Sequence, residues 1–264
     1  MSHVFLDEGA REGLRQLIRR SQAKPVATGG PSPDPAGKSP TPSATAIPTK
    51  VSGEGASKAE RLDSLRRQAE SWAPAKALGT LRETMVFATG NPDARVMLVG
   101  EAPGYEEEKK REPFVGPAGQ KLDDILKAMG LSRDEVYISN LVKFRPATPR
   151  QTTNNRKPGP EEIAACLPFI RAEIDIVRPA CIVALGGTAA EGLLGLTGQV
   201  GAMRGSWHEF GGIPVRVTYH PSYLLQSGAN LSIKRQVWED MLAVMERLAM
   251  PVSEKQRGFF LPKT

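Results

Sequence analysis

Four short segments of this 264-residue chain carry residue types that could bind and cleave a small polar molecule. Each directly follows or closes an apolar run: residues 100–104 (Gly-Glu-Ala-Pro-Gly), Asn140, residues 186–187 (Gly-Gly) and residues 220–222 (His-Pro-Ser). A glycine-rich turn offers backbone N–H groups, an asparagine amide both donates and accepts, and a histidine can stabilise developing charge. Each feature alone is usually structural, but the four together favour an active site.

The apolar runs that precede these segments alternate with stretches of helical periodicity. Strands are predicted at 95–100, 136–140, 181–186 and 215–219, and helices at 121–129, 161–177, 188–194 and 236–248. This alternation predicts an α/β fold, a three-layer sandwich with a central four-stranded parallel sheet flanked by helices. Ligands bind such sheets beyond the carboxyl ends of the strands, where the four segments would meet. Pro168 lies inside the second helix and is expected to bend it.

Composition and motifs exclude several classes of protein. The chain has a net charge of +6, two cysteines and three histidines, too few for a disulfide framework or a histidine-rich metal site. Dinucleotide-binding, P-loop and G-x-S-x-G patterns are absent. No apolar run reaches the roughly 18 residues of a spanning helix, and residues 1–20 lack a secretory core, so we expect a cytoplasmic protein without a membrane partner.

Basic residues occur in several loops near the predicted site. They are residues 109–111, Lys143 with Arg145, residues 156–157 and residues 234–235. Together with a pI near 9.4, they could follow the phosphates of a nucleic-acid strand, although a solvated loop is the favoured interpretation of any one cluster.

The chain divides into three parts by composition. Residues 1–58 are predicted to form a short amphipathic helix followed by a disordered linker rich in proline, serine and glycine. Residues 59–252 form the folded domain, and residues 253–264 form a C-terminal tail.

The motifs of the folded domain resemble those of uracil-DNA glycosylases of the iron–sulfur branch, known as family 4. The resemblance rests on residues 100–104, Glu107-Glu108, 113–116 (Pro-Phe-Val-Gly), Ala118-Gly119, Asn140 with Val142-Lys143, Asn155-Arg156, 160–166, 183–186, Trp207-His208 and 219–224 (Tyr-His-Pro-Ser-Tyr-Leu). It covers about residues 69–248 in order. It implies an enzyme that flips uracil out of DNA and hydrolyses its N-glycosidic bond, leaving an abasic site.

The resemblance also implies roles for individual residues around the base. The loop from Gly100 to Gly104 would offer backbone amides to uracil and help to position the attacking water. Phe114 would stack on the base, and Asn140 would pair with its O4/N3 edge. Glu107 matches the position that excludes the methyl group of thymine.

On the leaving-group side, His220 would face O2 and stabilise charge on the departing base, and it can do this while neutral. Ser222 belongs to the same substrate-binding set, and Leu224 would fill the gap left in the duplex. Glu101 is our candidate for holding the water. Ala102 stands where other branches of the superfamily carry an Asp or Asn activator, and the iron–sulfur branch also has a small residue there.

The chain departs from the family pattern at its metal centre. The four cluster cysteines align with Ala73, Lys76, Phe144 and Cys166, so Cys166 is the only ligand-position cysteine. A [4Fe–4S] cluster requires four ligands. We therefore predict no cluster, no other metal and no cofactor, with Phe144 and its apolar neighbours filling the vacated space.

Two further segments and several alternatives remain open at this point. Residues 226–232 look like an insertion after the His-Pro-Ser segment, and residues 256–261 faintly resemble a sliding-clamp-binding peptide, although docking onto the core is favoured for this tail.

The expected partner of the monomer is uracil-containing DNA, single- or double-stranded. Two other functions fit the same motifs: a non-catalytic binder of damaged or single-stranded DNA, and a glycosylase for another deaminated base. Residues 150–157 contain no histidine, which argues against a covalent DNA product.

Overall fold

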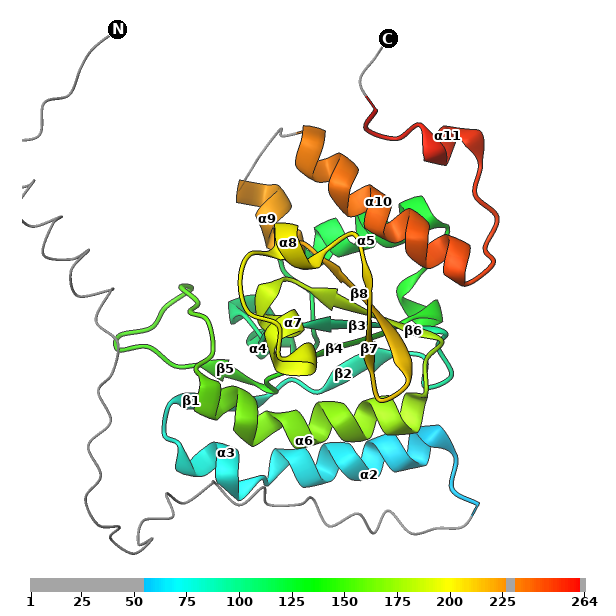
Figure 1. Ribbon diagram of the computed structural model, residues 1–264. Helices are drawn as coiled ribbons and strands as arrows, with labels where there is room; N and C mark the ends of the chain where they lie inside the picture. Colours follow the sequence, from blue (N-terminus) through cyan, green and yellow to red (C-terminus); the bar gives the residue numbers. More distant parts are fainter. Residues whose placement is uncertain (1–54, 227–230, 262–264) are drawn as a thin grey trace, which may run out of the picture. The chain divides into compact units, whose positions relative to one another are not determined.

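A six-stranded mixed sheet forms the centre of the computed structural model, which describes residues 55–226 and 231–261 (Figure 1). Its strand order is β2 (Ala88–Gly90), β4 (Tyr137–Asn140), β3 (Val96–Gly100), β6 (Cys181–Leu185), β8 (Ile213–Thr218) and β7 (Trp207–Phe210). The four inner strands are parallel, and the edge strands β2 and β7 pair antiparallel. The predicted four-stranded parallel sheet is confirmed, and the two short edge strands extend it.

Helices cover both faces of this sheet, as predicted for a three-layer α/β protein (Figure 1). The helices are α2 (Lys58–Glu70), α3 (Ala73–Ala77), α4 (Tyr105–Lys110), α5 (Pro117–Met129), α6 (Pro160–Val177), α7 (Gly187–Leu194), α8 (Val200–Met203), α9 (Pro221–Gln226), α10 (Leu231–Arg247) and α11 (Glu254–Arg257), with a 3-10 turn at Arg133–Glu135. A separate two-stranded sheet pairs β1 (Leu81–Met85) with β5 (Phe144–Pro146). Pro168 lies inside α6, which continues through it to Val177.

The alternation of side chains along β3 explains why the core has two halves. Met97 and Val99 point into the half that contains α2, α6 and α7, whereas Val96 and Leu98 point into the half that contains α5 and α10. All four side chains are buried. A central strand that is apolar on both faces is what a sheet covered on both sides requires.

The strand ends bring the predicted segments together. Gly100 at the end of β3 lies opposite Asn140 at the end of β4 in the parallel ladder. Leu185 pairs with Thr218 at the ends of β6 and β8, and the Gly186 N–H donates to the Thr218 carbonyl (2.9 Å). All four predicted segments therefore emerge at one edge of the sheet.

The C-terminal segment packs against α10. The Trp238 indole N–H donates to the Gln256 carbonyl (2.6 Å), and the Trp238 and Phe259 rings lie 5.2 Å apart. Arg235 donates to the carbonyls of Arg257 and Phe259, both at 2.8 Å. The tail is thus docked on the core as far as it is described, whereas the predicted N-terminal helix and most of the linker lie outside the described residues. Among the helices that the structure describes, none is long and apolar enough to cross a membrane.

Candidate active site

A pocket of about 290 Å³ opens at the carboxyl ends of the parallel strands. Its lining includes eight of the predicted site residues, namely Glu101, Ala102, Gly104, Glu107, Phe114, Asn140, His220 and Ser222. Pro103, Ala118, Asn155 and Arg156 complete the lining. This volume is at the small end of the range for ligand pockets and suits a single base.

Gly100 lies beneath the pocket and allows its two main walls to approach each other. A Cβ atom at Gly100 would come within 2.4 Å of the Asn140 Oδ1 atom and 2.5 Å of the Phe114 ring. Only glycine leaves room for both side chains at this point. Gly100 therefore has a steric role in this structure, whereas the backbone amides that residues 100–104 would offer to a base stay a prediction.

Asn140 is held from behind by a buried polar cluster. The Lys143 ammonium group donates to the Asn140 carbonyl (2.9 Å) and to the Ser139 hydroxyl (2.6 Å), and it pairs with the fully buried carboxylate of Glu173. Ser139 and Tyr137 also donate to Glu173, at 2.7 and 3.2 Å. Burial and this carboxylate raise the pKa of Tyr137 well above its usual value.

The burial of Lys143 corrects one sequence prediction. Lys143 is fully buried and Arg145 is only 2% exposed, so neither side chain can lie against a DNA phosphate. Their partners are Glu173 and Glu108, which lie 30 or more residues away along the chain. Each of these ion pairs neutralises a basic side chain with a carboxylate that is distant in the sequence. The sequence alone therefore shows the positive charge but not its neutralisation.

Phe114 forms one wall of the pocket in a backbone conformation that non-glycine residues rarely adopt. Its φ angle is 56°, in the left-handed region. Arg133 donates to the carbonyls of Pro113 (3.2 Å) and Phe114, and a Cβ at Gly119 would come within 1.7 Å of the Phe114 carbonyl oxygen. Backbone strain that is held in place by its surroundings is typical of functional sites.

Glu107 fastens two walls of the pocket together. Its carboxylate accepts the backbone N–H groups of Gly104 (3.2 Å), Val115 (3.0 Å) and Gly116 (2.8 Å). The first belongs to the Gly-Glu-Ala-Pro-Gly turn, and the other two directly follow Phe114. Glu107 therefore sets the separation between the turn and the stacking ring, in addition to lining the pocket.

His220 is held as a neutral donor. The Ser222 N–H donates to His220 Nδ1 (3.2 Å), and the Ser222 hydroxyl lies 2.8 Å from the same atom. An Nδ1 atom that accepts an N–H bond carries no proton, so the proton of the neutral ring is on Nε2. Burial lowers the pKa of His220 to about 4, against the opposing attraction of Glu107. Ser222 thus acts on the histidine, a role that the sequence did not reveal.

Glu101 lines the pocket next to Ala102. Its carboxylate accepts a hydrogen bond from the Thr188 hydroxyl (2.5 Å) at the start of α7. Burial raises the pKa of Glu101, outweighing the hydrogen bond from Thr188 and the attraction of Lys157. A carboxyl with a raised pKa is suited to proton transfer.

The sequence assigned no role to Asn155 and only a contact to DNA phosphates to Arg156, although both were part of the motif resemblance. They lie in the segment between β5 and α6 and line the pocket, where the Asn155 amide nitrogen would be 2.9 Å from a Cβ on Gly104. Arg156 makes a two-pronged ion pair with Glu162 (2.7 and 2.6 Å) and donates to the Ala147 carbonyl (2.8 Å). Their appearance as adjacent polar residues in the resemblance was the signal that could have identified them.

Leu224 lies outside this pocket, on α9. It borders a second cavity of about 300 Å³ together with Trp238 and Phe260. Its neighbours Tyr223 and Leu225 are each 41% exposed. An exposed apolar helix beside the pocket is consistent with the predicted role of Leu224 in filling a gap in the duplex.

The positions that align with cluster cysteines gather in one region of the molecule. Phe144 and Cys166 are buried in the same half of the core, α3 packs on α6, and Lys76 borders a surface cleft with Phe144. Ala73, Lys76 and Phe144 offer no thiolate, and burial raises the pKa of the Cys166 thiol to about 11. These residues do not fit a four-thiolate cluster. In the part of the chain that is described, no group of three or more His, Cys, Asp or Glu side chains is placed to hold a metal ion.

The fold and the pocket define a class of protein: a three-layer α/β protein with a small pocket at the carboxyl ends of its parallel strands. A family model for the uracil DNA glycosylase superfamily matches residues 87–242. The chain belongs to this superfamily. It is 44% identical over 162 residues to a type-4 uracil-DNA glycosylase of Thermotoga maritima, which covers 61% of this chain and 81% of the relative.

Two further relatives show the breadth of the similarity. A type-4 uracil-DNA glycosylase of Sulfurisphaera tokodaii is 36% identical over 201 residues, covering 72% of this chain and 87% of the relative. A type-5 uracil-DNA glycosylase of Pyrobaculum aerophilum is 33% identical over 177 residues, covering 61% and 73% respectively.

Proposed function

We propose that this protein is a monofunctional uracil-DNA glycosylase of base excision repair, which hydrolyses the N-glycosidic bond of uracil and leaves an abasic site. One observation carries the proposal: a base-sized pocket that combines the Phe114 ring, the buried Asn140 amide and the neutral His220 ring. Each of these three groups meets a different need of the reaction.

Recognition begins with a base that has left the duplex. Extrusion costs a few kcal/mol, and less from a single strand. Stacking on Phe114 returns about 1–3 kcal/mol. The Asn140 amide pairs with the O4/N3 edge of uracil, whereas cytosine presents a donor in place of an acceptor and leaves buried polar groups unpaired.

Thymine differs from uracil by one methyl group, which changes binding by only about 1–3 kcal/mol in a simple pocket. Exclusion therefore needs a rigid wall. Glu107 supplies it in our proposal, because three backbone N–H groups prevent its carboxylate from moving aside.

Bond cleavage builds positive charge on the sugar and negative charge on the departing base. His220 donates from Nε2 to the base oxygen O2 and stabilises the negative charge without being protonated itself. Ser222 fixes this tautomer through Nδ1.

Water is positioned at the other side of the sugar. We assign this role to Glu101, with Ala102 leaving space beside it, and Asn155 faces the same pocket. Glu101→Gln should slow excision more than about tenfold, since general acid–base catalysis contributes about 10²–10⁴-fold. A single-turnover rate equal to that of the wild type would reject Glu101 in this role.

The reaction in this chain proceeds without an iron–sulfur cluster. Support for this part of the proposal comes from the buried Phe144 ring, which shares a core with Cys166, Phe169 and Ala75 where a cluster would need thiolates. The ring pair of Trp72 and Phe169, 5.1 Å apart, adds further apolar packing in this region.

The proposed partner is uracil-containing DNA, single- or double-stranded, bound by a cytoplasmic monomer. Binding of residues 256–261 to a sliding clamp stays a prediction. It would require Phe259 to leave its contact with Trp238.

Single-turnover cleavage of a uracil-containing oligonucleotide, followed by alkaline scission, tests the proposed function. Wild-type protein should produce abasic sites, and both Asn140→Ala and His220→Ala should lose this activity while remaining folded. Parallel oligonucleotides with thymine or hypoxanthine should remain intact. Folded wild-type protein that binds the uracil strand without cutting would contradict the proposal and indicate a lesion-binding protein, and selective cutting at hypoxanthine would indicate another base.

A further inference from the structure

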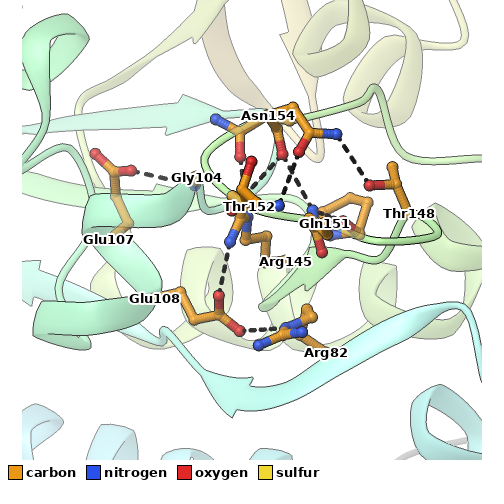
Figure 2. A network of polar contacts seen from close by, with 11 residues as sticks. Arg82, Gly104, Glu107, Glu108, Arg145, Thr148, Gln151, Thr152 and Asn154 are labelled. Atoms are coloured by element: carbon orange, nitrogen blue, oxygen red, sulfur yellow. Dashed lines mark hydrogen bonds and ion pairs between the residues drawn. The ribbon is translucent and has the colours of Figure 1, made fainter.

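Arg145 is the centre of a buried polar network beside the pocket (Figure 2). It is 2% exposed, and all three guanidinium nitrogens donate. Nε binds the Asn155 side-chain oxygen (2.9 Å), Nη1 binds the Glu108 carboxylate (3.0 Å), and Nη2 binds the carbonyls of Thr152 (2.9 Å) and Asn154 (2.8 Å). A planar guanidinium is the side chain best suited to satisfy several acceptors at fixed angles.

The segment that Arg145 holds has no helix or strand of its own. It runs from residue 147 to residue 159, between β5 and α6, and carries Asn155 into the pocket. Further bonds within it join Gln151 to the Pro146 carbonyl (2.9 Å) and Asn154 to the Thr148 hydroxyl (3.0 Å) (Figure 2). Without a backbone ladder, the position of Asn155 depends on these side-chain bonds.

Arg145 also determines the orientation of the Asn155 amide. A guanidinium N–H can only donate, so the amide oxygen of Asn155 must turn toward Arg145. The amide nitrogen then lies toward the Gly104 turn, where a Cβ on Gly104 would be 2.9 Å from it. The hydrogen bond from Nε thus prevents the amide from turning over.

The opposite end of the network anchors Arg145 to the other wall of the pocket. Glu108 lies on α4, directly after the Gly104 turn, and its second oxygen accepts from Arg82 (3.0 Å). The Arg145 guanidinium lies over the Tyr105 ring, 5.4 Å from its centroid. Glu108 and Arg145 therefore connect the turn on one side of the pocket with the Asn155 segment on the other.

We infer that Arg145 is a positioning residue for base excision, which acts through Asn155 by holding the 147–159 segment against the pocket with the amide nitrogen of Asn155 turned toward the Gly104 turn that lines it. The inference rests on the proposed function, since Asn155 matters only if the pocket cleaves a bond. Misplacement of a reacting or orienting group by about 1 Å can reduce a rate about a hundredfold.

A double-mutant cycle on Arg145 and Asn155 tests the inference. Arg145→Lys keeps the charge and can pair with Glu108, but one ammonium group cannot also reach Asn155 and both carbonyls. We expect Arg145→Lys and Asn155→Ala each to lower the single-turnover rate about ten- to hundredfold, with nearly unchanged DNA affinity. The combined variant should be no slower than Asn155→Ala. Independent losses that multiply in the combined variant would overturn the inference.

Arg82→Ala is the matched control, because it removes the other partner of Glu108 at a half-exposed position. Its rate should stay within about twofold of the wild type. If Arg145→Lys does not fold, Glu108→Gln replaces it in the same cycle and should show the same dependence on Asn155. Multiplying losses in that cycle would equally reject the inference.

The side-chain amide signal of Asn155 in a ¹⁵N NMR spectrum provides a readout that needs no turnover. It should shift in Arg145→Lys and remain in place in Arg82→Ala. An unshifted signal in Arg145→Lys would overturn the inference even if the wild type excises uracil. If the signal shifts in Arg145→Lys but the wild-type protein does not excise uracil, the proposed function is rejected instead.

Discussion

His220 should remain uncharged throughout the pH range in which the protein works. Burial lowers its pKa to about 4 from 6.5, which corresponds to about 3 kcal/mol against the imidazolium form. At about pH 5.5, about 3% of such a histidine is charged, whereas about 90% of an ordinary histidine would be. In a titration from pH 8 to pH 4, we therefore expect His220 to take up its proton only near pH 4.

NMR titration of the histidine ring signals is the direct assay. The chain has three histidines, so His220→Gln identifies the signals of His220 by their loss. We expect a midpoint near pH 4, and nitrogen shifts that place the proton of the neutral ring on Nε2, because Nδ1 accepts the Ser222 N–H. A midpoint between 6 and 7, or a proton on Nδ1, would refute the assignment of His220 as a neutral donor.

The same shift predicts how stability depends on pH. Because the pKa of His220 is lower in the folded state, the unfolded chain takes up the proton first as the pH falls. The free energy of unfolding should decrease between about pH 6.5 and pH 4. His220→Gln removes this contribution, so wild type should lose up to about 3 kcal/mol more than the variant over that range, and less where pocket solvent screens the ring. Parallel urea-denaturation curves at each pH measure it, and identical pH dependence would contradict the burial argument.

Three other predictions follow from the contacts around the pocket. Glu107→Ala should lower the free energy of unfolding by about 2 kcal/mol and allow measurable thymine excision, since three backbone N–H groups lose their acceptor. An unchanged melting temperature would contradict this. Lys143→Met should cost about 3–5 kcal/mol in chemical denaturation by leaving Glu173 unpaired, and adding Glu173→Leu should restore much of the loss; a further loss would disprove the pairing. Clamp pull-down should fail for wild-type protein while Phe259 is docked, and retention that disappears in Phe259→Ala/Phe260→Ala would show instead that the tail is released.

The fold was predictable because its central elements carry strong patterns. Strands such as β3 and β6 are apolar on both faces, and helices such as α5 carry a periodic apolar face. The edge strand β2 has only three residues, and the four residues of β7 do not alternate between apolar and polar, so neither has a pattern that separates it from a loop. They become strands by pairing with β4 and β8, and this pairing exists only in the tertiary structure.

The site was partly predictable for the same reason. Gly100, Asn140 and His220 stand at the ends of recognisable strands, so the topology of a parallel sheet brings them together. The roles of Lys143 and Arg145 were misread because their acidic partners are distant in sequence. Asn155 lies in a segment without periodicity, and only the network around Arg145 explains how it reaches the pocket.

The measurement that tests the central claim most directly combines iron analysis and uracil excision on one purified sample. We expect the purified wild-type protein to contain substoichiometric iron and acid-labile sulfide and to excise uracil in a single turnover. Asn140→Ala should lose this excision. A stoichiometric iron–sulfur cluster whose removal abolishes excision would contradict the claim that this chain performs the reaction with its own side chains alone.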